Sequence, residues 1–573
     1  MTMDLRIFRS FKAKYYEDDI LAGPGAYPEE YFAKLADHGF NAVWLRGILR
    51  NLAAADALPT LARDVPAHQD ALGTVVDRAT RHGVKVLLYL NEPLCLPADD
   101  PFWREHPETI GAYGDSGMDE WWATHALCTS VPAVQQWLRQ AARQLFADIP
   151  QLGGWFLISA SEHLTHCYSH RGWKTRDGRN EDCPRCSQRH PSDVAAEVIT
   201  LLRDGTRQAS PAARCIAWNW SWTMYEQDPQ DRLLDALPKD VTLLLDFERG
   251  GHRVMPGGKR IFIDEYSLSY VGPSERFMAG YHAARKRGLD VMAKLQIGTT
   301  HELATVPNLP LVNHVYEKLL AAQRLGLAGI VGTWNFGNAL SLNTAAVGEF
   351  VRNRDNGGRP GDFVKRLAAS YFPGADAAAV AAAIDLFCAA MEYFPFDMSM
   401  LYYGPANYAL AYPLTLNPLT GKSMGWSWMM HERGDDLSAS LGQFTLDEAI
   451  DAFAAVAAGW AAGAAALEKA LATCPAPRAR LELGVAKVAG ACFRSAANVY
   501  RTYRLRKDRP ADAERQFAAI AADEIENLAA ALPWIAADDR LGFHAECQGC
   551  QFSREMVGAK LATLRNVVKR DHP

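Results

Sequence analysis

The chain has 573 residues, which is too many for one ordinary core and predicts two domains. Hydrophobic residues make up 49% and charged residues 22%, as in soluble globular proteins, and a net charge of −6 provides no basic field for nucleic acid. We find no run of 18 or more apolar residues and no apolar signal-peptide core, so we expect no membrane span and no secretion. With 11 scattered cysteines, the sequence predicts a cytoplasmic protein with reduced thiols.

Short apolar runs alternate with amphipathic stretches over the first part of the chain. The candidate strands are 7–11, 41–46, 84–90, 155–159, 215–220, 242–247, 291–297 and 329–334, of which the first has the weakest pattern. Helical patterns between them, such as EEYFAKLADHG and SDVAAEVITLLRDG, end at glycine, a common residue just after a helix. This alternation predicts an α/β fold, a (β/α)8 TIM barrel, over residues 1–355.

Residues 356–573 have a different pattern, rich in alanine and without strand-like runs. One long helical pattern opens with Thr445 and Glu448 at capping-box spacing. We predict an α-helical C-terminal domain packed on the barrel, with a surface open to homo-oligomer formation. A stretch without helical period at 393–436, which contains Tyr403, is predicted to be an aromatic loop that reaches the barrel mouth.

Two glutamates follow predicted strands at positions suited to catalysis. Glu302 follows the seventh strand in GTTHELATVPNLP, and Glu162 follows the fourth in WFLISASEHLTHC. Turn residues at the carboxyl end of a barrel strand are where active sites form, so we expect both carboxylates to be exposed to a ligand across the mouth. Hydrolysis of a glycosidic bond needs two such carboxyl groups in different roles.

The placement of Glu162, Glu302 and Trp334 resembles the large clan of retaining glycoside hydrolases with an acid/base after strand four and a nucleophile after strand seven. The resemblance covers the barrel alone and depends on strand counting. It implies that Glu162 is the acid/base and Glu302 the nucleophile. The clan has Asn before the acid/base, where this chain has Ser161.

An Asn-Glu-Pro sequence does occur, as Asn91-Glu92-Pro93 after the third strand. Either the strand count is one short and Glu92 is the acid, or Asn91 and Glu92 are substrate ligands, which we favour. A weaker resemblance is to the β-hexosaminidases, barrels that include members with a following helical domain. It implies an Asp-Glu pair after strand four, which Ser161-Glu162 lacks, whereas Asp264-Glu265 lies between strands six and seven.

Other polar and aromatic residues near strand ends are candidates for binding a sugar. Aromatic faces stack on sugar rings, and a histidine beside a catalytic carboxylate can tune its pKa. The predicted substrate-binding residues are Asn91, Glu92, His163, Trp218, Asn219, Trp220, Asp246, Glu265, Gln296, His301, Trp334, Asn335 and Tyr403.

A cysteine-rich segment after the fourth strand has the spacing of a metal site. Cys183 and Cys186 form a CxxC pair, with Cys167 and His166 upstream. Three cysteines and a histidine match a closed tetrahedral zinc site, which would be structural. Free thiols in a turn are the alternative, and the second CxxC pair, Cys547 and Cys550, is a weak candidate.

The sequence therefore predicts a cytoplasmic, exo-acting, retaining glycosidase that acts on small oligosaccharides or glycosides and needs no cofactor for catalysis. Three alternatives stay open. One is an inverting or substrate-assisted glycosidase that uses Glu162 with Asp264 or Glu265. The second is a carbohydrate-binding barrel without catalysis or an assembly scaffold, because fold alone does not decide function. The third is a zinc-dependent hydrolase, against which the cysteine-rich spacing speaks.

Overall fold

A computed structural model describes residues 3–15, 17–115, 123–160, 163–169, 183–353, 358–418, 420–422, 434–547 and 549–571. Eight parallel strands form a closed barrel in chain order, which confirms the predicted fold class. They are β1 (Leu5–Phe8), β2 (Ala42–Gly47), β3 (Lys85–Leu90), β7 (Gly154–Ile158), β8 (Arg214–Trp218), β9 (Thr242–Asp246), β12 (Val291–Lys294) and β13 (Gly329–Val331).

The first strand begins two residues earlier than predicted and ends at Phe8. Ser10 leaves the sheet because its hydroxyl donates to the Ala26 carbonyl and its N–H donates to the Tyr27 hydroxyl. The other seven predicted strands coincide with barrel strands, with ends that differ by a few residues.

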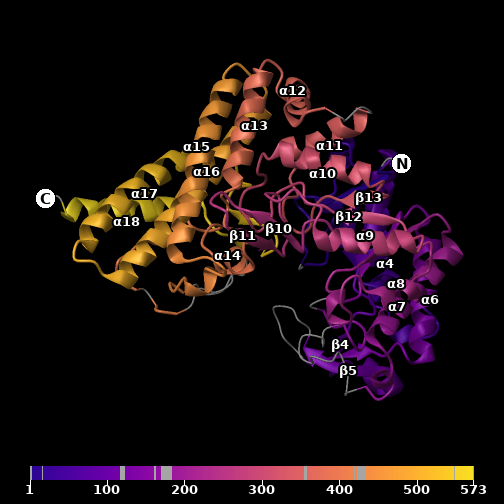
Figure 1. Ribbon diagram of the computed structural model, residues 1–573. Helices are drawn as coiled ribbons and strands as arrows, with labels where there is room; N and C mark the ends of the chain where they lie inside the picture. Colours follow the sequence, from indigo (N-terminus) through magenta and orange to yellow (C-terminus); the bar gives the residue numbers. More distant parts are fainter. Residues whose placement is uncertain are drawn as a thin grey trace.

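Helices cover the outside of the barrel (Figure 1). They are α1 (Gly23–Ala26), α2 (Glu29–Asp37), α3 (Leu49–Leu52), α4 (Val65–Arg81), α6 (Pro132–Asp148), α7 (Pro191–Ala209), α8 (Asp231–Ala236), α9 (Glu275–Lys286), α10 (Val312–Arg324) and α11 (Leu342–Arg352). Their apolar faces pack against the outward-facing strand residues, which alternate with those that fill the barrel.

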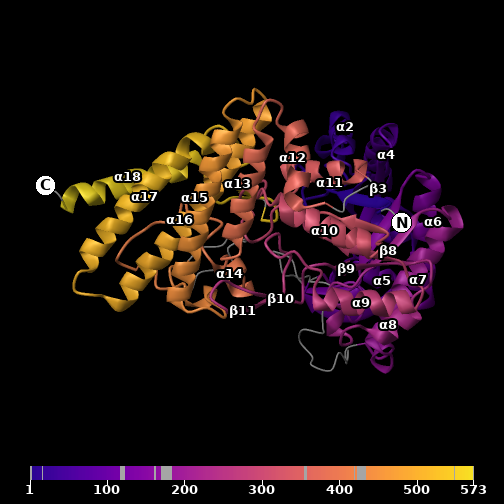
Figure 2. The same ribbon diagram turned by 45° about the horizontal axis from the view of Figure 1, so that its top comes forward.

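Two insertions interrupt the alternation at the carboxyl ends of strands. After β3 come α5 (Phe102–Glu105) and a small antiparallel sheet of β4 (Leu96–Pro97), β5 (Ile110–Asp115) and β6 (Ala123–Leu127). After β9 comes a hairpin of β10 (Gly251–Val254) and β11 (Arg260–Ile263). The hairpin lies between the barrel and the C-terminal helices in both ribbon views (Figures 1 and 2).

The C-terminal region is helical, as predicted. It comprises α12 (Pro360–Tyr371), α13 (Ala377–Met391), α14 (Met398–Tyr403), α15 (Leu446–Leu471), α16 (Pro477–Asp508), α17 (Ala513–Ile535) and α18 (Arg554–Asp571), with a short hairpin of β14 (Phe543–His544) and β15 (Gly549–Cys550) before the last helix. The capping box of Thr445 and Glu448 begins α15. Consecutive long helices pack side by side, α13 on α15, α15 on α16, and α16 on α17.

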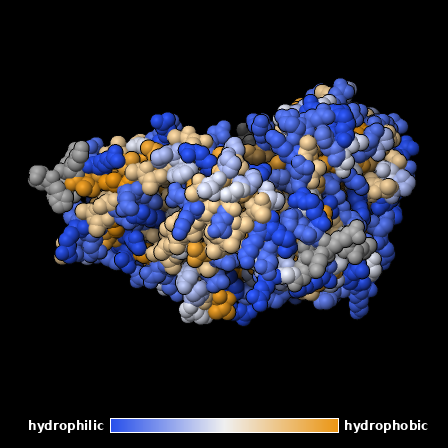
Figure 3. Space-filling view, turned by 90° about the horizontal axis from the view of Figure 1, so that it is seen from above, coloured by the Kyte–Doolittle hydropathy of each residue, from blue (hydrophilic) through white to orange (hydrophobic). Residues whose placement is uncertain are grey.

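One helix among the described residues, α15, is long and apolar enough to cross a membrane by length and composition alone. Here it lies between α13 and α16, where it buries Phe453, Val456 and Trp460. A core helix of a helical bundle has the same composition. From above, the helical region shows more hydrophobic surface than the barrel, whose visible face is mostly hydrophilic (Figure 3).

Polar contacts join the helical region to the barrel. The Arg253 guanidinium, on β10, donates to the carbonyls of Met391 and Phe394 at the end of α13. The Glu482 carboxylate, on α16, accepts from the Leu342 N–H at the start of α11. These contacts involve buried or half-buried groups, so separating the two regions would leave them unsatisfied.

Candidate active site at the barrel mouth

Aromatic side chains fill the upper interior of the barrel. Trp334, after β13, stacks on Trp44 with ring centroids 4.9 Å apart. Its edge contacts Tyr89 and Trp218, each at 5.0 Å, and Tyr15 lies 5.9 Å away. These residues follow from the strand alternation, which sends every second side chain inward. We call this cluster the aromatic floor; its rings lie at steep angles to Trp334 except for Trp44, and Trp334, at 8%, is its most exposed member.

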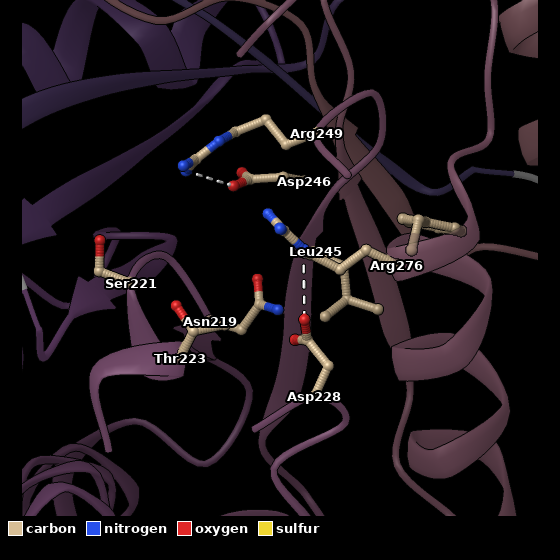
Figure 4. A pocket seen from close by; sticks show the side chains of 9 residues that line it. Asn219, Ser221, Thr223, Asp228, Leu245, Asp246, Arg249 and Arg276 are labelled. Atoms are coloured by element: carbon tan, nitrogen blue, oxygen red, sulfur yellow. Dashed lines mark hydrogen bonds and ion pairs between the residues drawn. The ribbon is translucent and has the colours of Figure 1, made fainter. Parts of the chain in front are cut away.

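Asp246 is the last residue of β9 and lies beside this floor. It accepts hydrogen bonds from Trp218 Nε1 at 2.8 Å and from Arg249 Nη1 at 3.1 Å. Burial raises the pKa of Asp246, while the Arg249 guanidinium and the Trp218 N–H act against that rise. Figure 4 shows the ion pair of Asp246 with Arg249, and a second pair of Asp228 with Arg276 below it.

A hollow of about 40 Å³ adjoins Asp246, lined also by Asn219, Arg249 and Arg276 (Figure 4). Its volume holds one or two water molecules and is too small for a sugar ring. Asn219, predicted to bind substrate, therefore contacts this polar side space rather than the aromatic floor.

Glu265 follows β11 and is 6% exposed. One carboxylate oxygen accepts the Tyr266 N–H at 2.8 Å, and the other accepts a short hydrogen bond from the Tyr402 hydroxyl. Tyr402 belongs to α14, so the helical region supplies a donor to a barrel carboxylate. Tyr403, the predicted ligand residue of this segment, is half-buried next to it, and its neighbour Tyr402 makes the contact with Glu265.

Lys294 ends β12 and pairs in register with Asp246 on the adjacent strand. Its ammonium donates to Gln296 Oε1 at 2.7 Å and lies 4.1 Å from the centre of the Tyr266 ring. Burial lowers the pKa of Lys294 to about 8, although the carboxylates of Glu248 and Asp246 favour its charged form. Gln296, predicted to bind substrate, is fully buried, with its amide nitrogen donating to the Thr299 carbonyl.

Glu302 is not exposed at the mouth, contrary to the expectation from its position after β12. Its side chain is 0% exposed. Its two oxygens accept hydrogen bonds from the hydroxyls of Ser267, Ser269 and Thr300 and from the N–H groups of Leu268 and Ser269. Such a carboxylate binds the 267–269 loop to the 300–302 turn and offers no unoccupied oxygen to a substrate.

Glu162, the predicted acid/base, lies outside the described residues. His163, next to it in sequence, is buried with its Nε2 3.4 Å from the Tyr15 hydroxyl. Asn91 is also buried and donates from Nδ2 to the Ile158 carbonyl at 3.3 Å. Tyr15, His163 and Asn91 therefore gather beneath the carboxyl ends of β3 and β7.

Glu92, predicted to be a substrate ligand, is 1% exposed. Its carboxylate accepts the N–H groups of Leu49 and Leu94 and so links the loops after β2 and β3. Burial raises the pKa of Glu92 to about 7, against the effect of these two N–H donors and of Arg50. The Leu49 contact spans 43 residues of sequence and the Leu94 contact is local, so the carboxylate joins two loops by backbone hydrogen bonds.

The remaining predicted residues differ in exposure. Trp220 is half-buried, packs against the aromatic cluster inside the barrel and has the Arg249 guanidinium 5.9 Å from its ring centre. Trp218 is fully enclosed and acts through its N–H bond to Asp246. Asn335 is buried next to Trp334.

His301 joins the mouth to the end of the chain. Its Nε2 lies 3.1 Å from Glu546 Oε2, in the turn between β14 and β15, and its ring packs on Phe336 and Tyr402. Glu546 also contributes to the electrostatic environment of Tyr402. A carboxylate far beyond the last barrel strand in sequence thus reaches the mouth.

Arg249, Lys294, Tyr402 and Glu546 are mouth residues that were not predicted from the sequence. Lys294 lies two residues after the inward-facing Met292 on β12, so strand parity would have identified it, whereas Arg249 lies past the end of β9. Tyr402 and Glu546 are placed by packing of the helical region, for which the sequence has no local signal.

A second cluster lies under the loop after β7. Cys128, Cys167, Cys183 and Cys186 are buried, and their sulfur atoms all lie within 4.8 Å of one another. The predicted fourth donor, His166, lies elsewhere: its Nδ1 accepts the Tyr168 N–H, and its Nε2 lies 3.4 Å from the Tyr225 hydroxyl. Cys128, which precedes α6, supplies the fourth donor instead. The four buried cysteines can hold a structural metal ion.

No family model matches this sequence, and no curated protein matches it. Among solved structures, the chain is similar to a GH138 enzyme targeting pectin rhamnogalacturonan II, with a TM-score of 0.56 and 10% identity over 98% of this chain and 67% of that chain. The likeness is lower to the exo-β-1,4-mannosidase Op5Man5 from Opitutaceae bacterium strain TAV5, with a TM-score of 0.37 and 15% identity over 61% of this chain and 59% of that chain. It is also lower to a GH5-4 broad specificity endoglucanase from Clostridium acetobutylicum, with a TM-score of 0.34 and 14% identity over 58% of this chain and 91% of that chain.

At these identities the likeness concerns the fold alone. The chain spans about two thirds of the length of the GH138 enzyme, and that match extends through the barrel and the helical region. The protein has a glycoside hydrolase-like (β/α)8 barrel followed by helices.

Proposed function

We propose that the protein is a glycoside hydrolase whose reaction takes place over the aromatic floor at the barrel mouth. The observation that carries this proposal is the pair of carboxylates Asp246 and Glu265, each held by fixed donors beside the aromatic floor. Glycosidic cleavage needs two carboxyl groups in different roles, of which Glu265 would supply one, while Asp246 would bind the substrate. The fold shared with the GH138 enzyme supports the same reaction class.

Glu265 is the proposed nucleophile in place of Glu302. The Tyr266 N–H and the Tyr402 hydroxyl orient its carboxylate, and Arg249 and Lys294 supply positive charge nearby. An oriented carboxylate is the group that attacks an anomeric carbon in a retaining reaction. Glu302 is 0% exposed and has five internal donors, whereas Glu265 is 6% exposed and has two, so Glu302 is proposed to be structural.

Glu162 remains the proposed acid/base, from its place after β7. It would protonate the leaving oxygen and then activate water, which gives net retention of configuration. Asp246, whose pKa burial raises, is proposed to hold the substrate hydroxyls beside Trp220. Tyr402 of α14 and Glu546 of the β14–β15 turn lie at the mouth, which favours small glycosides and exo-action.

The proposal is tested by incubating the protein with a panel of 2-deoxy-2-fluoro glycosyl fluorides and measuring intact mass, followed by peptide mapping. These reagents trap a covalent glycosyl-enzyme. We expect an adduct on Glu265. An adduct on Glu302 would contradict the assignment made here and support the clan resemblance.

Matched variants separate the remaining possibilities. Glu265→Gln should abolish cleavage of aryl glycosides while sugar binding persists, and Glu162→Gln should slow glycosides with poor leaving groups the most. Cleavage without any adduct would indicate an inverting or substrate-assisted reaction. Sugar binding without turnover by the unaltered protein would identify a carbohydrate-binding barrel and overturn the proposal.

A further inference from the structure

We propose that Cys128, Cys167, Cys183 and Cys186 bind one zinc ion that fixes the loop after β7 to the inserted sheet. The sulfur of Cys128 lies 3.6 Å from those of both Cys183 and Cys186, and all four sulfurs lie within 4.8 Å of one another. Four thiolates about 2.3 Å from a tetrahedral zinc ion are about 3.8 Å apart. The four sulfurs therefore already have the separation that a single ion requires.

The arrangement distinguishes a single ion from other uses of four cysteines. A disulfide would join sulfurs in pairs at about 2.05 Å, whereas here Cys128 Sγ lies 3.6 Å from two of the other sulfurs and all four lie close together. An iron–sulfur cluster would hold the sulfurs farther apart, because its irons and sulfides lie between them. Tetrahedral coordination by four thiolates is the usual environment of structural zinc.

Groups around the sulfurs support bound thiolates. The Arg185 guanidinium donates from Nε to Cys128 Sγ at 3.3 Å, and the Ser130 hydroxyl lies 3.4 Å from Cys186 Sγ. A zinc ion with four thiolates has a net charge of about −2, because the ion offsets half of the negative charge of the thiolates. Donors of this kind stabilise the negative charge that remains. A Cβ on Gly111 would lie 2.7 Å from Cys167 Sγ, so the backbone packs closely behind that sulfur.

The site is closed and joins two segments far apart in sequence. Cys128 follows β6 of the inserted sheet, Cys167 belongs to the loop after β7, and the CxxC pair precedes α7. The Tyr168 hydroxyl donates to the carbonyls of Cys186 and Arg189 and fixes the same loop from the other side. With four protein ligands the ion has no open position, so it is structural and not catalytic.

The same loop carries His163, which faces Tyr15 at the mouth. The ion therefore holds a part of the mouth in place. The expected effect on turnover depends on the proposed function, whereas metal binding does not.

The metal content of the full-length protein, purified without chelators, tests the proposal. We expect one zinc per chain by inductively coupled plasma mass spectrometry. Titration with an organomercurial should release it as four thiols react. Cys128→Ser should lose most of the zinc, whereas Cys95→Ala, which removes a buried thiol outside the cluster, should retain it. His166→Ala should also retain it.

Cobalt replacement keeps the test valid if a cysteine variant fails to fold. Cobalt bound by the unaltered protein should give the thiolate charge-transfer and intense visible bands of a tetrahedral sulfur site. Zinc-free protein from zinc-supplemented cells would overturn the proposal, as would disulfides among the four cysteines or iron in place of zinc. If activity falls while zinc stays bound, the glycosidase assignment is affected and the metal site is not.

Discussion

Glu302 follows a barrel strand, where catalytic residues are common, but its burial among hydrogen-bond donors indicates a structural role. Five donor groups surround its carboxylate, from the 267–269 loop and from Thr300. The serine hydroxyls could turn to accept, but the two N–H groups cannot. Oxygen acceptors are therefore required at this position, whether or not a substrate is present.

We predict that Glu302→Gln lowers the free energy of unfolding by about 1–3 kcal/mol, because the new amide N–H faces donors. Urea denaturation of the variant and the unaltered protein measures this difference. Glu265→Gln serves as the comparison and should lose activity with little loss of stability. If Glu302→Gln kept full stability and lost all turnover, Glu302 would be catalytic.

Glu92 makes stability depend on pH. Its pKa is raised from 4.5 to about 7 by burial, so between these values the folded state binds a proton that the unfolded state has released. The contribution of Glu92 to the free energy of unfolding is therefore complete below pH 4.5, its pKa in the unfolded chain. This contribution falls by about 3 kcal/mol as the pH rises to about 7, its pKa in the folded protein.

We predict that Glu92→Gln removes this slope, because glutamine does not titrate. Urea unfolding at several pH values between 4.5 and about 7 measures it, with Glu105→Gln, on the exposed surface of α5, as the control. If Glu92→Gln kept the same dependence of unfolding free energy on pH as the unaltered protein, another titrating group would be its cause.

At the scale of elements, the β14–β15 hairpin brings the end of the chain to the barrel. The Gly542 N–H donates to the Thr305 carbonyl at 2.8 Å, and Phe543 packs on Phe11. The turn between the strands then places Glu546 beside His301. The loops after β1 and β12 thus hold the base of the hairpin, and His301 contacts its turn.

We predict that Glu546→Gln lowers kcat/KM about tenfold, which corresponds to about 1.4 kcal/mol, because it weakens the positioning of His301 and Tyr402. Steady-state kinetics on an aryl glycoside found by the panel measures the change. Glu514→Gln, on the exposed first turn of α17, should leave kcat/KM unaltered. If Glu546→Gln and Glu514→Gln had the same kcat/KM, Glu546 would have no role in positioning His301 and Tyr402.

At the scale of the whole molecule, the barrel and the helical region share buried contacts. The Asn407 amide oxygen accepts the Ala304 N–H at 2.7 Å, and its nitrogen donates to the His301 carbonyl. With Arg253 and Glu482, such contacts tie loops on both sides of the mouth to the helices. Separating the barrel from the helical region would break these hydrogen bonds and leave their donors and acceptors without their partners.

We predict that the two regions unfold together. Differential scanning calorimetry should give one transition, in which the calorimetric and van't Hoff enthalpies agree. A fragment of residues 3–353 should be insoluble or lack cooperative unfolding. Two separate transitions, or a stable active fragment, would show that the barrel folds on its own.

The sequence by itself determined the barrel and the helical region, because alternation and helical period are local properties. All eight strands were identified, with β1 displaced because Ser10 is held by Ala26 and Tyr27 across the fold. Trp334 at the mouth and three of the four clustered cysteines also follow from spacing along the chain.

The surroundings of each carboxylate depend on tertiary packing. Glu302, Glu92 and Glu265 all follow strands, and each accepts a hydrogen bond from a segment distant in sequence: Leu268, Leu49 and Tyr402, respectively. Cys128, Tyr402 and Glu546 join their sites from distant segments. Their placement results from packing between elements, and no pattern of neighbouring residues encodes such contacts.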